Sequence, residues 1–134
     1  MERTVEKTPP SESPHANDRT SIKMVTAIIR TEKLDVLKYA LNKLNLVGGL
    51  TVSTVRGFGH QRGSLEHYMG VPYQIRFIDK VKIEMAISSD DVPQVMTIIG
   101  QLAHTGRPGD GKIFVSDVRT ALRIRTGEKG VDAL

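Results

Sequence analysis

A glycine-rich stretch, TGRPGDGKI at residues 105–113, is the part of this sequence best suited to bind an anion. It contains the G-x-x-x-x-G-K pattern that opens a P-loop, but Ile113 stands where a P-loop has its magnesium-binding hydroxyl. A helical apolar pattern precedes the loop and a strand-like run follows it, so no helix N-terminus points at a bound phosphate. Backbone N–H groups and Lys112 remain as anion ligands, and magnesium must be held elsewhere.

Arg123 and Arg125 in the segment LRIRT form a second candidate for anion binding. On an extended segment, residues two apart project to the same face, with Leu122 and Ile124 on the other. Two guanidinium groups on one face can donate bidentate hydrogen bonds to phosphate oxygens. When the pair is taken alone, an exposed edge strand with ordinary solubilising charge is the favoured explanation. Combined with the glycine-rich stretch and Lys112, the pair favours an anion site.

Gly109 and Gly111 permit a tight turn in which backbone N–H groups point at one centre, although a plain helix-to-strand turn also uses glycine. Asp110 between them is ill suited to touch a phosphate, so we expect it to brace the loop or a basic partner. Gln61 and Lys80 stand at the two ends of a long connection, where they either converge on one site or are simply solvated polar residues.

Composition excludes several kinds of function. The chain has no cysteine, its four histidines lack metal-ligand spacing, and no nucleophile and base are arranged together, so a catalytic role is disfavoured. The net charge is +4, yet no aromatic residues alternate with basic ones as in a nucleic-acid platform, and a small polyanion fits the basic surplus in 105–125 better. Without a membrane-spanning stretch or secretory signal, the chain is predicted to be soluble and cytoplasmic.

The remaining pattern supplies elements that position these residues. Residues 22–30 are predicted to form a buried strand, followed by a helix with leucines at helical spacing that ends at Gly49. A strand over 50–58 follows. Apolar residues then alternate from Tyr73 to Ile87, with Asp79 on the apolar phase, which suggests a bulge or local bend there. A second apolar helix pattern and a last strand around 113–119 complete the chain.

This β-α-β, β-α-β order predicts an α+β, ferredoxin-like fold, in which two helices cover one face of a four-stranded antiparallel sheet. The other face must then be buried by another subunit or a ligand. Residues 1–20 are rich in proline and polar groups, so they are predicted to be a disordered tail before a domain at 21–134. The connection over 59–73 is too long for a hairpin and is expected to be functional.

Several stretches together resemble the PII nitrogen-regulatory signal transduction family: TAIIR, LTVSTVRGFGHQRG, KVKIEM, TGRPGDGKIFV and RIRTGE. The similarity covers about residues 22–130. It implies a homotrimer of ferredoxin-like subunits that binds ATP or ADP in the clefts between subunits. It also implies a non-enzymatic sensor whose mobile T-loop, over 59–74, docks on a partner such as an ammonium transporter or a metabolic enzyme.

The resemblance assigns roles to individual positions. For nucleotide binding, it implies that Thr51 lies near the adenine and that Gly57 and Gly59 line the cleft, together with His60 and Gln61. The residues that it implies for contacts with the phosphates are Gly109, Asp110, Gly111, Lys112, Arg123 and Arg125. Gln61 matches the glutamine that meets Mg and 2-oxoglutarate, and Lys80 matches the lysine that pairs with the 2-oxoglutarate carboxylate. Tyr73 matches the tyrosine that some members carry as a nucleotidylation site.

The sequence also departs from the family pattern. His60 stands where the family usually has arginine, residues 64–72 differ from the usual loop, Pro72 replaces an acid before Tyr73, and Val71 replaces a serine that is phosphorylated in other members. These departures leave open a divergent nucleotide sensor that has lost 2-oxoglutarate sensing. A small trimeric ATP-hydrolysing enzyme is a third hypothesis, but the sequence offers no general base for it.

Overall fold

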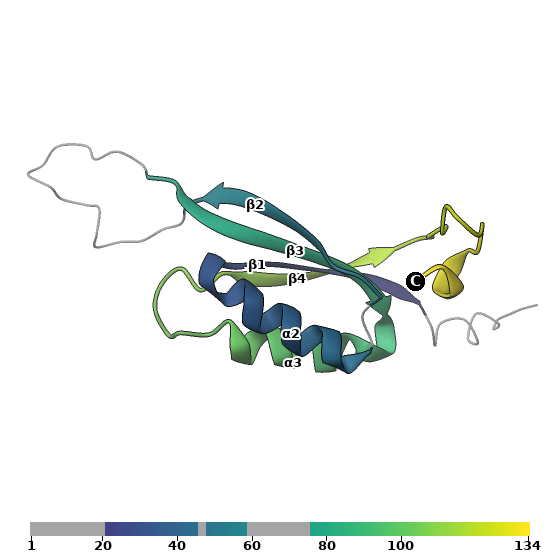
Figure 1. Ribbon diagram of the computed structural model, residues 1–134, viewed down its shortest axis with the longest axis horizontal. Helices are drawn as coiled ribbons and strands as arrows, with labels where there is room; N and C mark the ends of the chain where they lie inside the picture. The colour runs from purple at the N-terminus through teal and green to yellow at the C-terminus, as the bar shows by residue number, and fades with distance from the viewer. Residues whose placement is uncertain (1–20, 46–47, 59–75) are drawn as a thin grey trace, which may run out of the picture.

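The structure is a computed structural model that describes residues 21–45, 48–58 and 76–134. A four-stranded antiparallel sheet carries two α-helices on one face (Figure 1). The strands are β1 (Ile22–Arg30), β2 (Thr51–Gly57), β3 (Ile78–Ser88) and β4 (Lys112–Val118), the α-helices are α2 (Leu34–Leu44) and α3 (Val92–Leu102), and the 3-10 turns are η1 (Thr31–Lys33), η2 (Ser89–Asp91) and η3 (Gly130–Ala133). The strand order β2-β3-β1-β4 confirms the predicted ferredoxin-like α+β fold. The predicted tail (1–20) and T-loop (59–74) lie outside the described residues.

The hydrophobic core lies between the sheet and the helix layer. Alternate residues of β1 and β3 point toward the helices and are buried, as their period-2 pattern predicts. They meet the inward leucines of α2 and the inward valine and isoleucine of α3. The buried set is Val25, Ala27, Ile29, Leu37, Leu41, Val81, Ile83, Met85, Ile87, Val95, Ile99 and Ala103.

The opposite face of the sheet has no helix over it in the described part of the chain. The central strands present alternately polar and apolar side chains there, and the edge strand β4 adds Phe114, which is 52% exposed. Phe114 lies opposite Thr26 of β1, so its exposed ring belongs to this uncovered face. Coverage of this face by another subunit or a ligand stays a prediction.

The predicted bulge at Asp79 is wrong. The pairing between β2 and β3 runs without interruption from Thr51 opposite Glu84 to Gly57 opposite Ile78, and Asp79 lies directly opposite Arg56. A bulge is not needed because Asp79 is exposed although it lies on the apolar phase of β3. The pairing of β1 with β3 ends at Lys80, so residue 79 lies beyond the part of the sheet that the helices cover. Asp79 is therefore solvated and forms an ion pair with Arg56 (Nε–Oδ1 3.4 Å).

The end of the first helix also differs from the prediction. The pattern placed it at Gly49, whereas α2 ends at Leu44 and Asn45 adopts a left-handed conformation, with φ of 62°. Asparagine tolerates this conformation better than most residues with a side chain, so Asn45 can end a helix as glycine does. Neither α-helix exceeds 11 residues, about half of what a membrane span requires.

Gly100 gives a test of the helix layer. It lies inside α3, where glycine destabilises a helix by roughly 0.5–1 kcal/mol relative to alanine. A Cβ at this position would meet no atom within 4 Å. We therefore expect Gly100→Ala to raise the free energy of unfolding by about that amount, measured by urea denaturation. An unchanged or lower stability would show that another surface packs closely against this side of α3.

Candidate functional site

The glycine-rich stretch forms a loop from the end of α3 to the start of β4 (Figure 1, green, at the left). Gly106, Gly109 and Gly111 have φ of 88°, 102° and 99°, a conformation that side chains disfavour. At Gly111 the constraint is stronger, because a Cβ would overlap the carbonyl oxygen of Ile28 and lie 2.8 Å from its carbonyl carbon. Glycine is what allows the loop to pass against the backbone of β1.

Asp110 closes this loop with its carboxylate. It accepts hydrogen bonds from the Thr105 N–H (2.7 Å), the Thr105 hydroxyl (2.5 Å), the Gly106 N–H (2.9 Å) and Arg30 Nε (2.9 Å). The Thr105 hydroxyl, followed by the Thr105 N–H and then Arg30 and the Gly106 N–H, holds the pKa of Asp110 well below its usual range. The expectation that Asp110 braces the loop and a basic partner is confirmed.

The low pKa of Asp110 predicts an acid-sensitive loop. The folded pKa lies below the unfolded value of about 3.9, so the contribution to stability is fully present above that pH and is lost as pH falls toward the folded pKa. We expect the free energy of unfolding to fall between about pH 5 and pH 3, and to fall less steeply in Asp110→Asn. Urea titrations of both proteins across this range measure the difference, and equal slopes would contradict it.

Two cations from neighbouring strands reach the loop. Arg30 ends β1 and lies opposite Lys80 of β3. Arg30 Nη2 donates to the Pro108 carbonyl (2.8 Å) and, at 3.5 Å, to the Arg107 carbonyl, while Lys80 Nζ donates to the Gly109 carbonyl. The structure thus brings Lys80 to the glycine loop. Sequence analysis missed Arg30, and its only signal was a lone arginine at the end of a buried strand.

These contacts fix the direction of the loop's N–H groups. In a trans peptide the carbonyl and the next N–H point in opposite directions. Because the carbonyls of Pro108 and Gly109 point at Arg30 and Lys80, the N–H groups of Gly109 and Asp110 point away from these cations. Two successive N–H groups that point out of a glycine-rich turn, with Lys112 two residues after the second, are donors of the kind that can bind phosphate.

The other predicted ligands are more scattered. Gly57 lies opposite Ile78, near Lys80, but Thr51 starts β2 at the opposite edge of the sheet from Lys112. Gly59, His60, Gln61 and Tyr73 lie outside the described residues.

The extended geometry predicted for Arg123 and Arg125 is wrong. Leu122 bridges to Lys129, and residues 124–126 form a turn that is closed by hydrogen bonds from Gly127 N–H to the Arg123 carbonyl (2.7 Å) and from Arg123 N–H to the Glu128 carbonyl (2.8 Å). Gly127 adopts a φ of 78°, which favours this reversal over a continuing strand. The two arginines therefore do not share a face through strand periodicity.

Arg123 instead contacts the end of the same chain. Its Nη2 donates to the carbonyl oxygen of Leu134 (2.6 Å) and its Nε to that of Ala133 (3.4 Å). Nη1 lies 3.8 Å from Glu128 Oε1.

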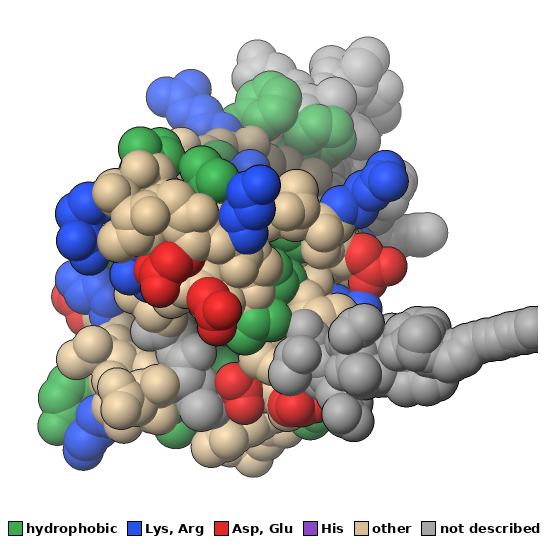
Figure 2. Space-filling model, turned by 90° about the vertical axis from the view of Figure 1, so that its right-hand side faces the viewer, with side chains coloured by type: hydrophobic (Ala, Val, Ile, Leu, Met, Phe, Trp, Pro, Cys, Tyr) green, Lys and Arg blue, Asp and Glu red, His purple; other side chains and the backbone are tan. Residues whose placement is uncertain are grey.

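One subunit does not gather the predicted anion ligands. The glycine loop enters β4 at Lys112, whereas Arg123 and Arg125 follow its other end at Val118 (Figure 1). A seven-residue strand spans about 20 Å, so the two groups lie at opposite ends of the molecule. Figure 2 shows the end with the C-terminal segment, where acidic and basic side chains are interspersed. The single basic surface expected from residues 105–125 is not formed within one copy.

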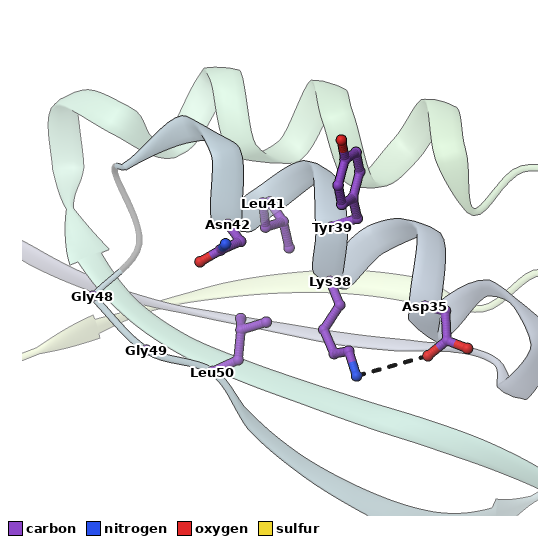
Figure 3. A pocket seen from close by; sticks show the side chains of 8 residues that line it. All are labelled: Asp35, Lys38, Tyr39, Leu41, Asn42, Gly48, Gly49 and Leu50. Carbon is purple, nitrogen blue, oxygen red and sulfur yellow. Dashed lines mark ion pairs between the residues drawn. The ribbon is translucent and has the colours of Figure 1, made fainter.

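A hollow of about 500 Å³ lies between α2 and the chain entering β2 (Figure 3). Leu41 and Leu50 provide apolar walls, and Lys38 approaches Asp35 at its rim (3.7 Å). Among the residues that the structure describes, none of those predicted to bind an effector lines this hollow. A smaller hollow of about 270 Å³ lies against the glycine loop itself, and its walls include His104, Asp110, Gly111 and Lys112.

The sequence from β1 to the C-terminal segment matches a known family. Residues 22–128 match the family described as nitrogen regulatory protein P-II. Nitrogen regulatory protein P-II of Bradyrhizobium diazoefficiens is 49% identical over 113 residues, and GlnK of Escherichia coli K12 is 45% identical; each match covers 84% of this chain and the whole relative. The chain belongs to the P-II family of nitrogen regulatory proteins.

Solved structures agree with this assignment. The B. subtilis GlnK–ATP complex superposes with a TM-score of 0.72 at 34% identity, covering 85% of this chain and 96% of that one. Arabidopsis thaliana PII bound to citrate superposes with a TM-score of 0.70 at 37% identity, covering 86% and 94%. The resemblance stated from the sequence motifs is thus confirmed, together with its ferredoxin-like fold.

Proposed function

We propose that this protein senses ATP, ADP and 2-oxoglutarate and regulates a partner protein through its T-loop. One observation carries the proposal: Lys80, the candidate 2-oxoglutarate ligand, contacts Gly109 of the candidate phosphate loop although 29 residues separate them. Two effectors that bind to adjoining groups can influence each other's affinity through that contact. Such a connection is what a combined sensor of nucleotide and carbon state requires.

Phosphate binding is supported by the shape of the glycine loop. The outward N–H groups of Gly109 and Asp110 supply fixed donors, the positive φ of Gly109 and Gly111 allows the turn that presents them, and Lys112 adds a charge. A solved relative that shares the overall fold, B. subtilis GlnK, is described in complex with ATP. Magnesium and 2-oxoglutarate would involve Gln61, and 2-oxoglutarate would pair with Lys80.

A homotrimer would complete the site. Arg123 and Arg125 lie at the far end of β4 from the glycine loop, so they complete a phosphate site only if a second copy supplies them. The uncovered sheet face with Phe114 is the surface available for such assembly. Nucleotide in a cleft between copies would thus meet the glycine loop of one subunit and the arginines of its neighbour.

The output would be regulatory and not catalytic, exerted in the cytoplasm on a transporter or metabolic enzyme by residues 59–74. The divergent alternative, a nucleotide sensor without 2-oxoglutarate sensing, is motivated by His60 at a position where the family usually has arginine. Measuring 2-oxoglutarate binding in the presence of Mg-ATP distinguishes the combined sensor from the sensor of nucleotides alone.

Assembly and nucleotide binding give the first test. We expect light scattering at micromolar concentration to give three times the mass of the 14.8 kDa chain, and calorimetry to show binding of both ATP and ADP. A monomeric mass would contradict the proposed nucleotide cleft between subunits. A trimer that binds neither nucleotide would remove the sensing role while leaving the fold assignment intact.

A further inference from the structure

Arg30 is joined to the glycine loop at three points, 77 to 80 residues away in sequence. Its Nε donates to Asp110 Oδ1 at 2.9 Å, and its Nη2 donates to the carbonyls of Pro108 at 2.8 Å and Arg107 at 3.5 Å. The side chain is only 17% exposed. A half-buried guanidinium with this many acceptors is held in one place, and it holds those acceptors in return.

The two acceptors closest to Arg30 lie on either side of Gly109. One is the backbone carbonyl of Pro108 and the other is the carboxylate of Asp110, so the planar guanidinium spans the residue between them. Lys80 also contacts Gly109, but through a single ammonium on a flexible chain. Arg30 is therefore the group that sets the orientation of the peptide between Pro108 and Gly109.

We propose that Arg30 is a positioning residue for polyphosphate binding. By holding the Pro108 carbonyl inward, it directs the Gly109 N–H outward to the anion, and by holding Asp110 it keeps the turn closed. This inference rests on the proposed function, because it assumes that the outward N–H groups receive phosphate. Arg30 acts through the loop and does not itself contact the nucleotide.

The test compares Arg30→Met and Arg30→Lys with the matched control Arg56→Met. Arg56 also lies near a strand end and pairs with a carboxylate, but its partner Asp79 belongs to β3 and not to the glycine loop. Removing a charge-assisted hydrogen bond costs about 1.5–3 kcal/mol, so we expect ATP affinity to fall about 10- to 100-fold in Arg30→Met. The ATP affinity of Arg30→Lys, which can keep one contact, should lie between those of Arg30→Met and the wild type. The ATP affinity of Arg56→Met should match that of the wild type.

A second measurement needs no ligand. In NMR spectra of the ligand-free protein, the amide signals of Gly109 and Asp110 should move in Arg30→Met and return part of the way in Arg30→Lys. Signals from the middle of α2 should stay in place. A general loss of structure would move both sets and lower the unfolding temperature, so the two effects are distinguishable.

ATP affinity within twofold of the wild type in Arg30→Met would overturn the inference. So would weakened binding with unmoved Gly109 and Asp110 amides, because Arg30 would then act by direct contact. If Arg30→Met does not fold, wild-type affinity and wild-type amide positions in Arg30→Lys overturn it instead. Should the wild type bind no ATP, the proposed function fails, and the ligand-free amide shifts still decide whether Arg30 orients the loop.

Discussion

Gly111→Ala should reduce ATP affinity by about 100-fold or more, the largest effect expected from an alanine substitution at any glycine that the structure describes. Two causes combine. The residue has a φ of 99°, where backbone strain costs about 1–3 kcal/mol for a residue with a side chain, and its Cβ would overlap the carbonyl oxygen of Ile28. Since the overlapped atom is backbone in the central strand β1, the loop must move and its donors lose their alignment.

Gly130→Ala is the matched control for this substitution. Gly130 also has a positive φ, 69°, but a Cβ there would meet no atom within 4 Å. Gly130→Ala therefore introduces backbone strain without a steric clash, and it should leave ATP affinity within a few-fold of the wild type. Calorimetric titration of both variants with ATP makes the comparison. Equal affinity of Gly111→Ala and the wild type would show that this loop does not hold the phosphates.

Lys80→Ala should abolish detectable 2-oxoglutarate binding while reducing the affinity for ATP alone by less than about tenfold. Removing one partner of a desolvated charge pair costs about 3–5 kcal/mol, which exceeds 100-fold in affinity. The ATP effect is smaller but not zero, because Lys80 also holds the Gly109 carbonyl, while Arg30 still orients the adjoining peptide. The structure thus adds a modest nucleotide effect to what the family resemblance alone implies for this lysine.

Lys82→Ala is the control for Lys80→Ala. Lys82 projects from the same face of β3 two residues further on, opposite Ile28 and Ser53, and has the same charge. A general loss of positive potential would weaken binding in both variants. We expect only Lys80→Ala to lose 2-oxoglutarate, measured by calorimetry in saturating Mg-ATP. Retained 2-oxoglutarate binding in Lys80→Ala would remove this residue from the site.

The period-2 pattern of β3 was sufficient to predict its buried residues, because a strand covered on one face fixes which side chains face the core. The same rule failed at Asp79, since the sequence does not reveal where the helix layer stops covering the sheet. It failed again at Arg123 and Arg125, because the chain turns at residues 124–126, where the Gly127 N–H donates to the Arg123 carbonyl.

The contacts that build the candidate site were only partly predictable. The glycines and Asp110 predicted a braced turn, because glycine permits tight backbone turns and an Asp side chain can accept hydrogen bonds from nearby backbone N–H groups. The braces themselves, Arg30 and Lys80, come from other strands, so only the tertiary structure brings them to the loop. The separation of Arg123 from Lys112 likewise depends on the length and direction of β4.

Combined sensing of nucleotide and 2-oxoglutarate is tested by a calorimetric titration of the wild type with 2-oxoglutarate, in the presence and absence of saturating Mg-ATP. We expect binding with Mg-ATP and little or none without it. We also expect 2-oxoglutarate to tighten the binding of Mg-ATP by the same factor by which Mg-ATP tightens the binding of 2-oxoglutarate, because the coupling free energy between two sites is reciprocal. If millimolar 2-oxoglutarate gives no binding heat with Mg-ATP bound, the sensing claim is contradicted, and a sensor of nucleotides alone is the function that remains.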